Sequence, residues 1–129
     1  MDTISLELAI APVAALPGLS DPLWCDWLSP AELAYCGGLQ RAGEHLAARA
    51  LGKQVAADAL VWTRPVPWRD MEIRRRPGCA PELVVVGELN QWCQQHQLAI
   101  PGVSLSHAAG HAAAVAWSGR MPDPTPVWR

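Results

Sequence analysis

The chain has 129 residues, of which 50% are hydrophobic and 17% are charged, and its formal net charge at pH 7 is -2. This balance excludes a disordered chain and a surface built to bind a polyanion, so nucleic acid is not expected as a partner. The length fits one domain, small enough for its core to gain from oligomerisation.

Two further features bear on where the protein works. The four cysteines include no C-x-x-C pair and lack the spacing of a zinc site, so we expect free thiols in a reducing compartment. The opening residues, MDTISLELAIAPVAAL, are apolar but have no basic segment and contain a glutamate and a proline. We therefore expect neither a membrane span nor an export signal, and the predicted location is the cytoplasm.

The first predicted element is a strand over residues 4–10, where apolar and smaller or polar residues alternate. The large apolar side chains of this segment are Ile4, Leu6, Leu8 and Ile10. They are predicted to form the core-facing side of the strand. Glu7 is then expected on the opposite side.

Two helices are predicted next. Ser29 can cap a helix, Pro30 fits its first turn, and Glu32 completes a capping box. The glycines at 37–38 interrupt this helix. The segment RAGEHLAARALGKQVAADAL, from Arg41 to Leu60, consists almost entirely of helix formers and is predicted to be the long helix of the domain.

The second half of the chain is predicted to contain two hairpins. The segment VWTRPVPW has two prolines and is expected to be a loop, whereas DMEIRRR and ELVVV flank the turn PGCAP as in a hairpin with an interior second strand. A short helix at 87–97 follows. A strand that begins after Pro101 and Gly102, a turn near Gly110 and a strand through Trp117 complete the pattern.

This order of elements predicts an α+β fold in which an antiparallel sheet packs on one long helix. Residues 1–120 are expected to form a single domain, and the proline-rich residues 121–129 an extended tail. The chain has seven tryptophans and no phenylalanine. The tryptophans either replace phenylalanine in the core or line a large apolar cleft.

Three segments carry a resemblance to a known family: ISLEL, EHLAARALGKQVAADAL, and WRDMEIRRRPGCAPEL followed by VSLSHAAGHAAAVA. In this order they resemble the small holo-acyl-carrier-protein synthases, which are single-domain phosphopantetheinyl transferases. The resemblance spans Ile4 to Trp117. It implies an α+β fold, a homotrimer with clefts between subunits, and transfer of the phosphopantetheine arm of coenzyme A to a serine of an acyl carrier protein.

Transfer of a phosphoryl group requires that negative charge on phosphorus be neutralised, and magnesium held by carboxylates does this well. The resemblance implies metal ligands at Glu7 and Gln54, where the family has an aspartate and a glutamate. Gln54 brings no charge, and Asp58 stands where the family has a lysine. The expected magnesium site is therefore degraded.

The resemblance also implies a surface that binds coenzyme A. Its expected members are Arg49, Lys53, Ser104, Ser106 and His107. Hydroxyl, imidazole and cationic groups of this kind donate hydrogen bonds to phosphate oxygens. The alternative for the serines and the histidine is that they are ordinary polar strand residues that satisfy the neighbouring backbone.

Arg74, Arg75 and Arg76 form a short basic run. Such a run is either a solvated strand end or a contact for an acidic partner, and carrier proteins present an acidic surface.

Three functions are consistent with these residues. The main hypothesis is a reassigned enzyme that binds an apolar polyketide-type intermediate in the interface cleft and cyclises, isomerises or dehydrates it without a cofactor, with Glu7, Asp58 and His107 as acid and base groups. The alternative is a working phosphopantetheinyl transferase that uses coenzyme A and Mg²⁺. A third possibility is a non-catalytic partner that binds a carrier protein.

Overall fold

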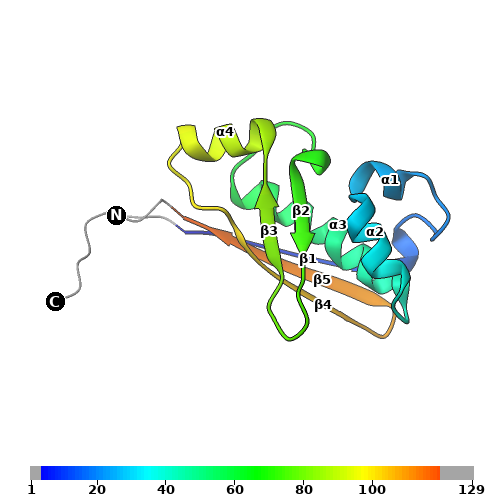
Figure 1. The fold of residues 1–129 in the computed structure, drawn as a ribbon. Helices are drawn as coiled ribbons and strands as arrows, with labels where there is room; N and C mark the ends of the chain where they lie inside the picture. Colours follow the sequence, from blue (N-terminus) through cyan, green and yellow to red (C-terminus); the bar gives the residue numbers. More distant parts are fainter. Residues whose placement is uncertain (1–3, 120–129) are drawn as a thin grey trace.

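The computed structural model describes residues 4–119 and centres on a three-stranded antiparallel sheet covered on one face by a long helix (Figure 1). The sheet order is β1-β5-β4, with β1 at Ser5–Pro12, β5 at His111–Ser118 and β4 at Gly102–Ala108. The helix, α3, spans Ala42–Ala59. These elements confirm the predicted α+β class and the predicted long helix.

Small residues let α3 lie close to the sheet. The facing side chains of β5 are the buried Ala112, Ala114 and Ala116. On the helix, a Cβ atom added at Gly52 would come within 2.9 Å of Ile73 and Leu105 side chains. The distance between helix and sheet is therefore set by alanine and glycine, with little room for larger side chains.

The predicted orientation of the first strand is wrong. The strand alternates as expected, but Leu6, Leu8 and Ile10 are 68%, 64% and 67% exposed. Glu7 lies on the other face, half-buried towards α3. The reason is the close approach of α3, which leaves room beneath the helix for Ala9 and Ala11 but not for a row of large aliphatic side chains.

Helices α1 (Leu23–Trp27) and α2 (Pro30–Gly37) precede α3. The predicted capping box is present in full, because the Ser29 hydroxyl accepts from the Glu32 backbone and the Glu32 carboxylate accepts from the Ser29 backbone. The sequence analysis did not predict α1. Its Trp24 is buried and donates to the carbonyl of Gly18.

The first predicted hairpin is β2 (Met71–Arg74) paired with β3 (Glu82–Val85), and α4 (Gly87–Gln95) follows it. This hairpin forms a two-stranded sheet that is separate from the three-stranded one. Only Leu83 of β3 is buried, and the strand is less interior than predicted. The closing hairpin, β4 with β5, is confirmed.

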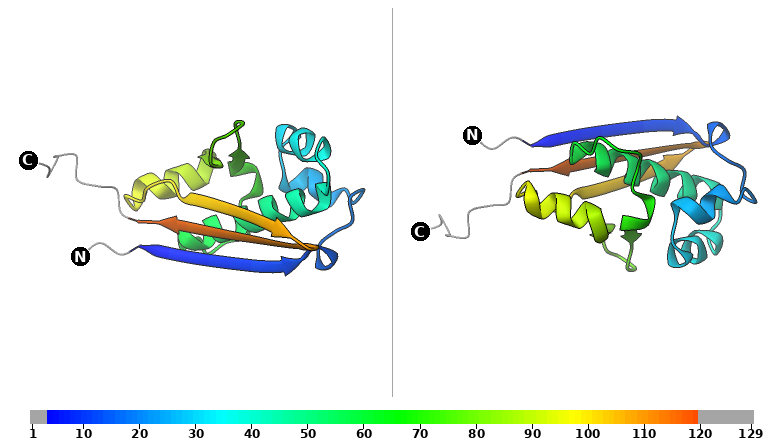
Figure 2. Two further views of the ribbon diagram at one scale, coloured as in Figure 1. Left: turned by 90° about the horizontal axis from the view of Figure 1, so that it is seen from below. Right: turned by 90° about the horizontal axis from the view of Figure 1, so that it is seen from above.

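All the other described elements lie on the α3 side of the main sheet, and its outer face is bare in the views of Figure 2. Within residues 4–119, no helix is both long and apolar enough to cross a membrane. All four cysteines are free thiols, as expected. The predicted tail at 121–129 and the domain boundary at 120 lie outside the described residues.

Candidate active site

A polar pocket of about 230 Å³ lies where the first half of α3 meets β4. The helix contributes His45 and Arg49, the strand contributes Ser106 and His107, and Arg75 reaches the pocket from the turn after β2. His45 and Arg49 are four residues apart and therefore share one face of α3. The pocket thus gathers imidazole and guanidinium groups, which can donate hydrogen bonds to an anion.

A carboxylate from α3 holds the imidazole of His107. Nδ1 of His107 lies 3.0 Å from Oε1 of Glu44, which is in the first helical turn, where the helix dipole favours negative charge. Glu44 is only 8% exposed. The hydrogen bond with His107 lowers the pKa of Glu44, and the backbone of Gly110 lowers it further, so this carboxylate is ionised at neutral pH.

A second imidazole lies beside the first. The rings of His45 and His107 are 4.2 Å apart between centroids. Burial lowers the pKa of His45, and the charge of Arg49 lowers it further. His45 is therefore neutral at pH 7.

Arg49 brings a buried positive charge to the pocket. It is 3% exposed, and its guanidinium carbon lies 4.6 Å from the ring centroid of Tyr35. Among the residues that the structure describes, Arg49 has no carboxylate partner and its Nε has no hydrogen-bond partner. A buried charge without a counter-ion costs free energy, so this site favours an incoming anion.

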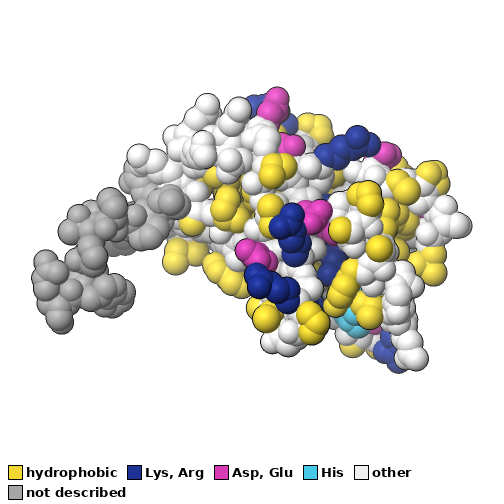
Figure 3. Space-filling model, in the orientation of Figure 1, with side chains coloured by type: hydrophobic (Ala, Val, Ile, Leu, Met, Phe, Trp, Pro, Cys, Tyr) yellow, Lys and Arg dark blue, Asp and Glu magenta, His cyan; other side chains and the backbone are white. Residues whose placement is uncertain are grey.

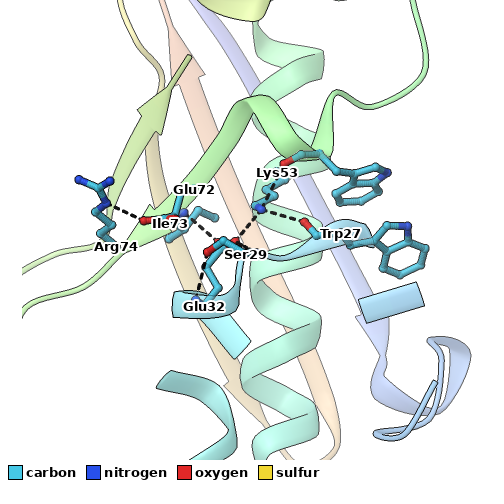
Figure 4. Close-up of polar contacts among 8 residues, drawn as sticks. Trp27, Ser29, Glu32, Lys53, Glu72, Ile73 and Arg74 are labelled. Atoms are coloured by element: carbon cyan, nitrogen blue, oxygen red, sulfur yellow. Dashed lines mark hydrogen bonds and ion pairs between the residues drawn. The ribbon is translucent and has the colours of Figure 1, made fainter. Parts of the chain in front are cut away.

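Lys53 is buried and hydrogen-bonded in the interior of the protein (Figure 4). Its Nζ donates to the Glu32 carboxylate at 2.7 Å, to the Trp27 carbonyl at 2.8 Å and to the Trp68 carbonyl at 3.3 Å. These three acceptors use all its protons, and the side chain is 1% exposed. Burial lowers the pKa of Lys53, and the hydrogen bond with Glu32 opposes that shift. Lys53 does not line the pocket, and the geometry does not support its predicted contact with phosphate.

The tryptophans pack in pairs. Trp27 stacks on Trp68 with ring centroids 5.0 Å apart, and Trp62 meets Trp92 edge-on at 5.4 Å. Trp24 and Trp62 are buried, which favours the core role. Trp27 and Trp68 also line a cavity of about 460 Å³ between α1 and the β2–β3 hairpin.

The search against protein-family models finds no match. The chain is 33% identical to a holo-[acyl-carrier-protein] synthase of Streptomyces coelicolor over 115 residues, which cover 89% of this chain and 90% of that protein. It is 37% identical over 89 residues to the synthase of Moorella thermoacetica, which covers 68% of this chain and 70% of the relative. The chain belongs to the holo-[acyl-carrier-protein] synthase family.

Solved structures of the same family have the same fold. The synthase of Chronobacterium ammoniagenes in complex with coenzyme A superposes with a TM-score of 0.76 at 18% identity, over 94% of this chain and 99% of that one. The synthase of Neisseria meningitidis gives a TM-score of 0.75 at 19% identity, over 88% and 96%. At these identities the likeness shows the fold alone.

The magnesium ligands expected from the family do not form a charged site. Gln54 and Asp58 are exposed on α3, Glu7 lies beside Ala116 on the sheet, and none of them lines the 230 Å³ pocket. Residues 4–119 contain no group of three or more His, Cys, Asp or Glu side chains that could hold a metal ion. One carboxylate and one neutral amide are a poor donor set for Mg²⁺.

Only some of the residues that were predicted to bind coenzyme A come together in the structure. Arg49, Ser106 and His107 come together in the pocket. Ser104 and Ser106 share the exposed face of β4, opposite the face of His107, and Ser104 does not line the pocket. The pattern in β4 alternates as predicted.

The basic run of this synthase homologue is largely neutralised. Arg74 pairs with Glu72 at 2.6 Å between Nε and Oε1, and Arg76 lies 3.9 Å from Glu82. Figure 3 shows positive and negative side chains next to one another over this hairpin. Within the described chain, Arg75 alone of the three has no ion-pair partner, and it lines the pocket. Contact of the run with a carrier protein stays a prediction.

The sequence analysis missed the pocket residue His45 and the carboxylate of Glu44 that contacts His107. His45 had a usable signal, since it lies four positions before Arg49 on the helix. Glu44 had none, because its partner His107 is 63 positions away along the chain.

Proposed function

We propose that this protein transfers the 4'-phosphopantetheine arm of coenzyme A to a serine of an acyl carrier protein. One observation carries the proposal: the 33% identity to a named holo-[acyl-carrier-protein] synthase extends over 90% of that protein. Neighbours of the same fold, from Chronobacterium ammoniagenes and Helicobacter pylori, are complexes with coenzyme A. This supports the transferase over the reassigned enzyme.

The pocket residues match what the substrate needs. In the transfer, the serine oxygen forms a bond to the phosphorus that carries the pantetheine arm, and the bond from that phosphorus to adenosine 3',5'-bisphosphate breaks. Arg49 and Arg75 neutralise negative charge on the diphosphate. A volume of about 230 Å³ has room for phosphate groups but not for the whole of coenzyme A, which must extend out of the pocket.

The cofactor-free conversion of a polyketide-type intermediate has less support. Its three acid and base candidates were Glu7, Asp58 and His107. Only His107 lies in the polar pocket, and the other two are on different surfaces. No described contact favours a non-catalytic role over the transferase.

The exposed row on β1 supports assembly into a homotrimer. Leu6, Leu8 and Ile10 share the outer face of the sheet, and Trp117 of β5 is 44% exposed. A contiguous apolar face of this kind is unusual on a monomer and typical of a subunit interface. The trimer that the family resemblance implies would cover it.

Intact mass spectrometry of apo carrier proteins incubated with coenzyme A tests the transferase. Each assay runs with and without magnesium, and carriers whose acceptor serine is replaced by alanine serve as controls. We expect the serine carriers alone to gain one phosphopantetheine arm. Unchanged masses for all carriers tested would overturn the proposal.

A further inference from the structure

The contact between Glu44 and His107 joins two elements that are distant in sequence. Glu44 is in the first turn of α3, His107 is near the end of β4, and the Oε1–Nδ1 distance is 3.0 Å. His107 lines the pocket whereas Glu44 does not. Glu44 can therefore affect a bound ligand only through His107.

The charge of Glu44 determines which nitrogen of His107 carries a proton. The carboxylate is ionised, because the hydrogen bond with His107 lowers its pKa and the nearby charge of Arg41 acts in the same direction. An ionised carboxylate can only accept, so Nδ1 must be the N–H nitrogen. In the neutral imidazole, Nε2 then keeps its lone pair, and no described side chain occupies it.

The neighbouring groups distinguish His107 from His45 as the candidate base. Burial lowers the pKa of His45, and the nearby charges of Arg49 and Arg75 act in the same direction. Glu44 opposes that shift only weakly and makes its short contact with His107. Within residues 4–119, His107 is the one of these two imidazoles whose tautomer is fixed by a carboxylate partner.

We infer that Glu44 is a positioning residue that presents Nε2 of His107 to the pocket as the acceptor of the carrier serine's proton. The inference rests on the proposed transfer. As the serine oxygen bonds to phosphorus, its proton passes to Nε2, and the electron pair of the broken P–O bond leaves with adenosine 3',5'-bisphosphate. An imidazole that is held in one tautomer accepts a proton more readily, because the ring does not have to reorient before the proton transfer.

The test compares Glu44→Gln, Glu44→Asp and, as a matched control, Glu88→Gln, which changes an exposed carboxylate on α4. A glutamine has the shape of Glu44, but its amide can donate to Nδ1 and so shift the imidazole proton to Nε2. We expect kcat of Glu44→Gln to fall about 100-fold with the KM for coenzyme A within twofold. Glu44→Asp should recover part of the loss, and Glu88→Gln should match the unmodified protein.

A second readout does not depend on turnover. In protein labelled with ¹⁵N-histidine, NMR should show His107 protonated at Nδ1, and Glu44→Gln should move the proton to Nε2. An unchanged tautomer in Glu44→Gln, or a kcat within twofold, would overturn the inference. If the unmodified chain transfers no arm, the proposed function fails, and the NMR result alone decides whether Glu44 fixes His107. Should Glu44→Gln not fold, the same measurements on Glu44→Asp must show a smaller loss in the same direction.

Discussion

Lys53 and Glu32 form an ion pair in the interior, with Nζ and Oε1 2.7 Å apart and both side chains 1% exposed. The remaining carboxylate oxygen accepts from the backbone N–H of Ile73 at 2.9 Å. Through this one pair, α2 is tied to α3 and to β2. The lysine of the long helix thus serves the fold, although the family resemblance implied a role at coenzyme A.

Breaking this pair should strongly destabilise the protein. Lys53→Met leaves the Glu32 carboxylate buried and uncompensated, and we expect the free energy of unfolding to fall by about 3–5 kcal/mol. Urea unfolding of the variant and of Lys53→Met with Glu32→Gln measures this. The double variant should recover part of the loss. A loss below about 1 kcal/mol in the single variant would show that the pair is dispensable.

Neighbouring arginines should differ in their effect on coenzyme A. Arg75 lines the pocket, whereas Arg76 lies against Glu82. Arg75→Gln is expected to weaken coenzyme A binding about fivefold to tenfold, and Arg76→Gln to leave it unchanged, because only Arg75 faces the phosphate site. Calorimetric titration at two salt concentrations measures both. Equal affinity in the two variants would place the ligand elsewhere.

The charges missing from α3 can be restored at low structural cost. Gln54 and Asp58 are exposed and four residues apart, so Gln54→Glu with Asp58→Lys also forms a favourable pair along the helix. We expect this double variant to gain magnesium-dependent binding of coenzyme A, because a second carboxylate and a cation are supplied. The titration is repeated with and without Mg²⁺. An unchanged affinity would mean that these positions do not correspond to the family's site.

The outer face of the sheet should control assembly. Leu8→Lys places a charge in the middle of the exposed apolar row, and we expect it to convert a trimer into monomers. Leu19→Lys, at a similarly exposed loop position, is the control and should leave the mass unchanged. Light scattering coupled to gel filtration gives the mass. A monomeric unmodified protein would rule out the trimer directly.

Acid should weaken the contribution of Glu44. Its pKa lies below the ordinary value of 4.5, so the folded protein binds this proton less readily than the unfolded chain does. The resulting stability is present above pH 4.5 and is lost as the pH falls through the lowered pKa. Melting temperatures of the unmodified protein and Glu44→Gln should therefore differ at pH 7 and converge below pH 4. A constant difference across this range would contradict the assignment.

Local sequence patterns predicted where the helices and strands lie better than they predicted which face of each is buried. The capping box at Ser29 and Glu32 and the bounds of α3 follow from neighbouring residues and could be read from the sequence. The inward face of β1 could not, because it depends on how closely the alanines of β5 let α3 approach. The alternation shows that a strand has two different faces, but it does not show which face packs against the helix and which against another subunit.

The candidate site shows the same division. Arg49 and His107 were predicted from motifs of the family, and the structure brings them together. The burial of Lys53 depends on carbonyls of Trp27 and Trp68, 26 and 15 positions away, which no spacing rule identifies. Glu44 likewise required the packing of α3 against β4.

The most direct test of the account is whether arm transfer and nucleotide release occur together. The protein is incubated with coenzyme A and an apo acyl carrier protein, and modified carrier and adenosine 3',5'-bisphosphate are quantified in the same samples. We predict that the two products rise one for one. Unmodified carrier and intact coenzyme A, with every carrier tested and with or without magnesium, would contradict it.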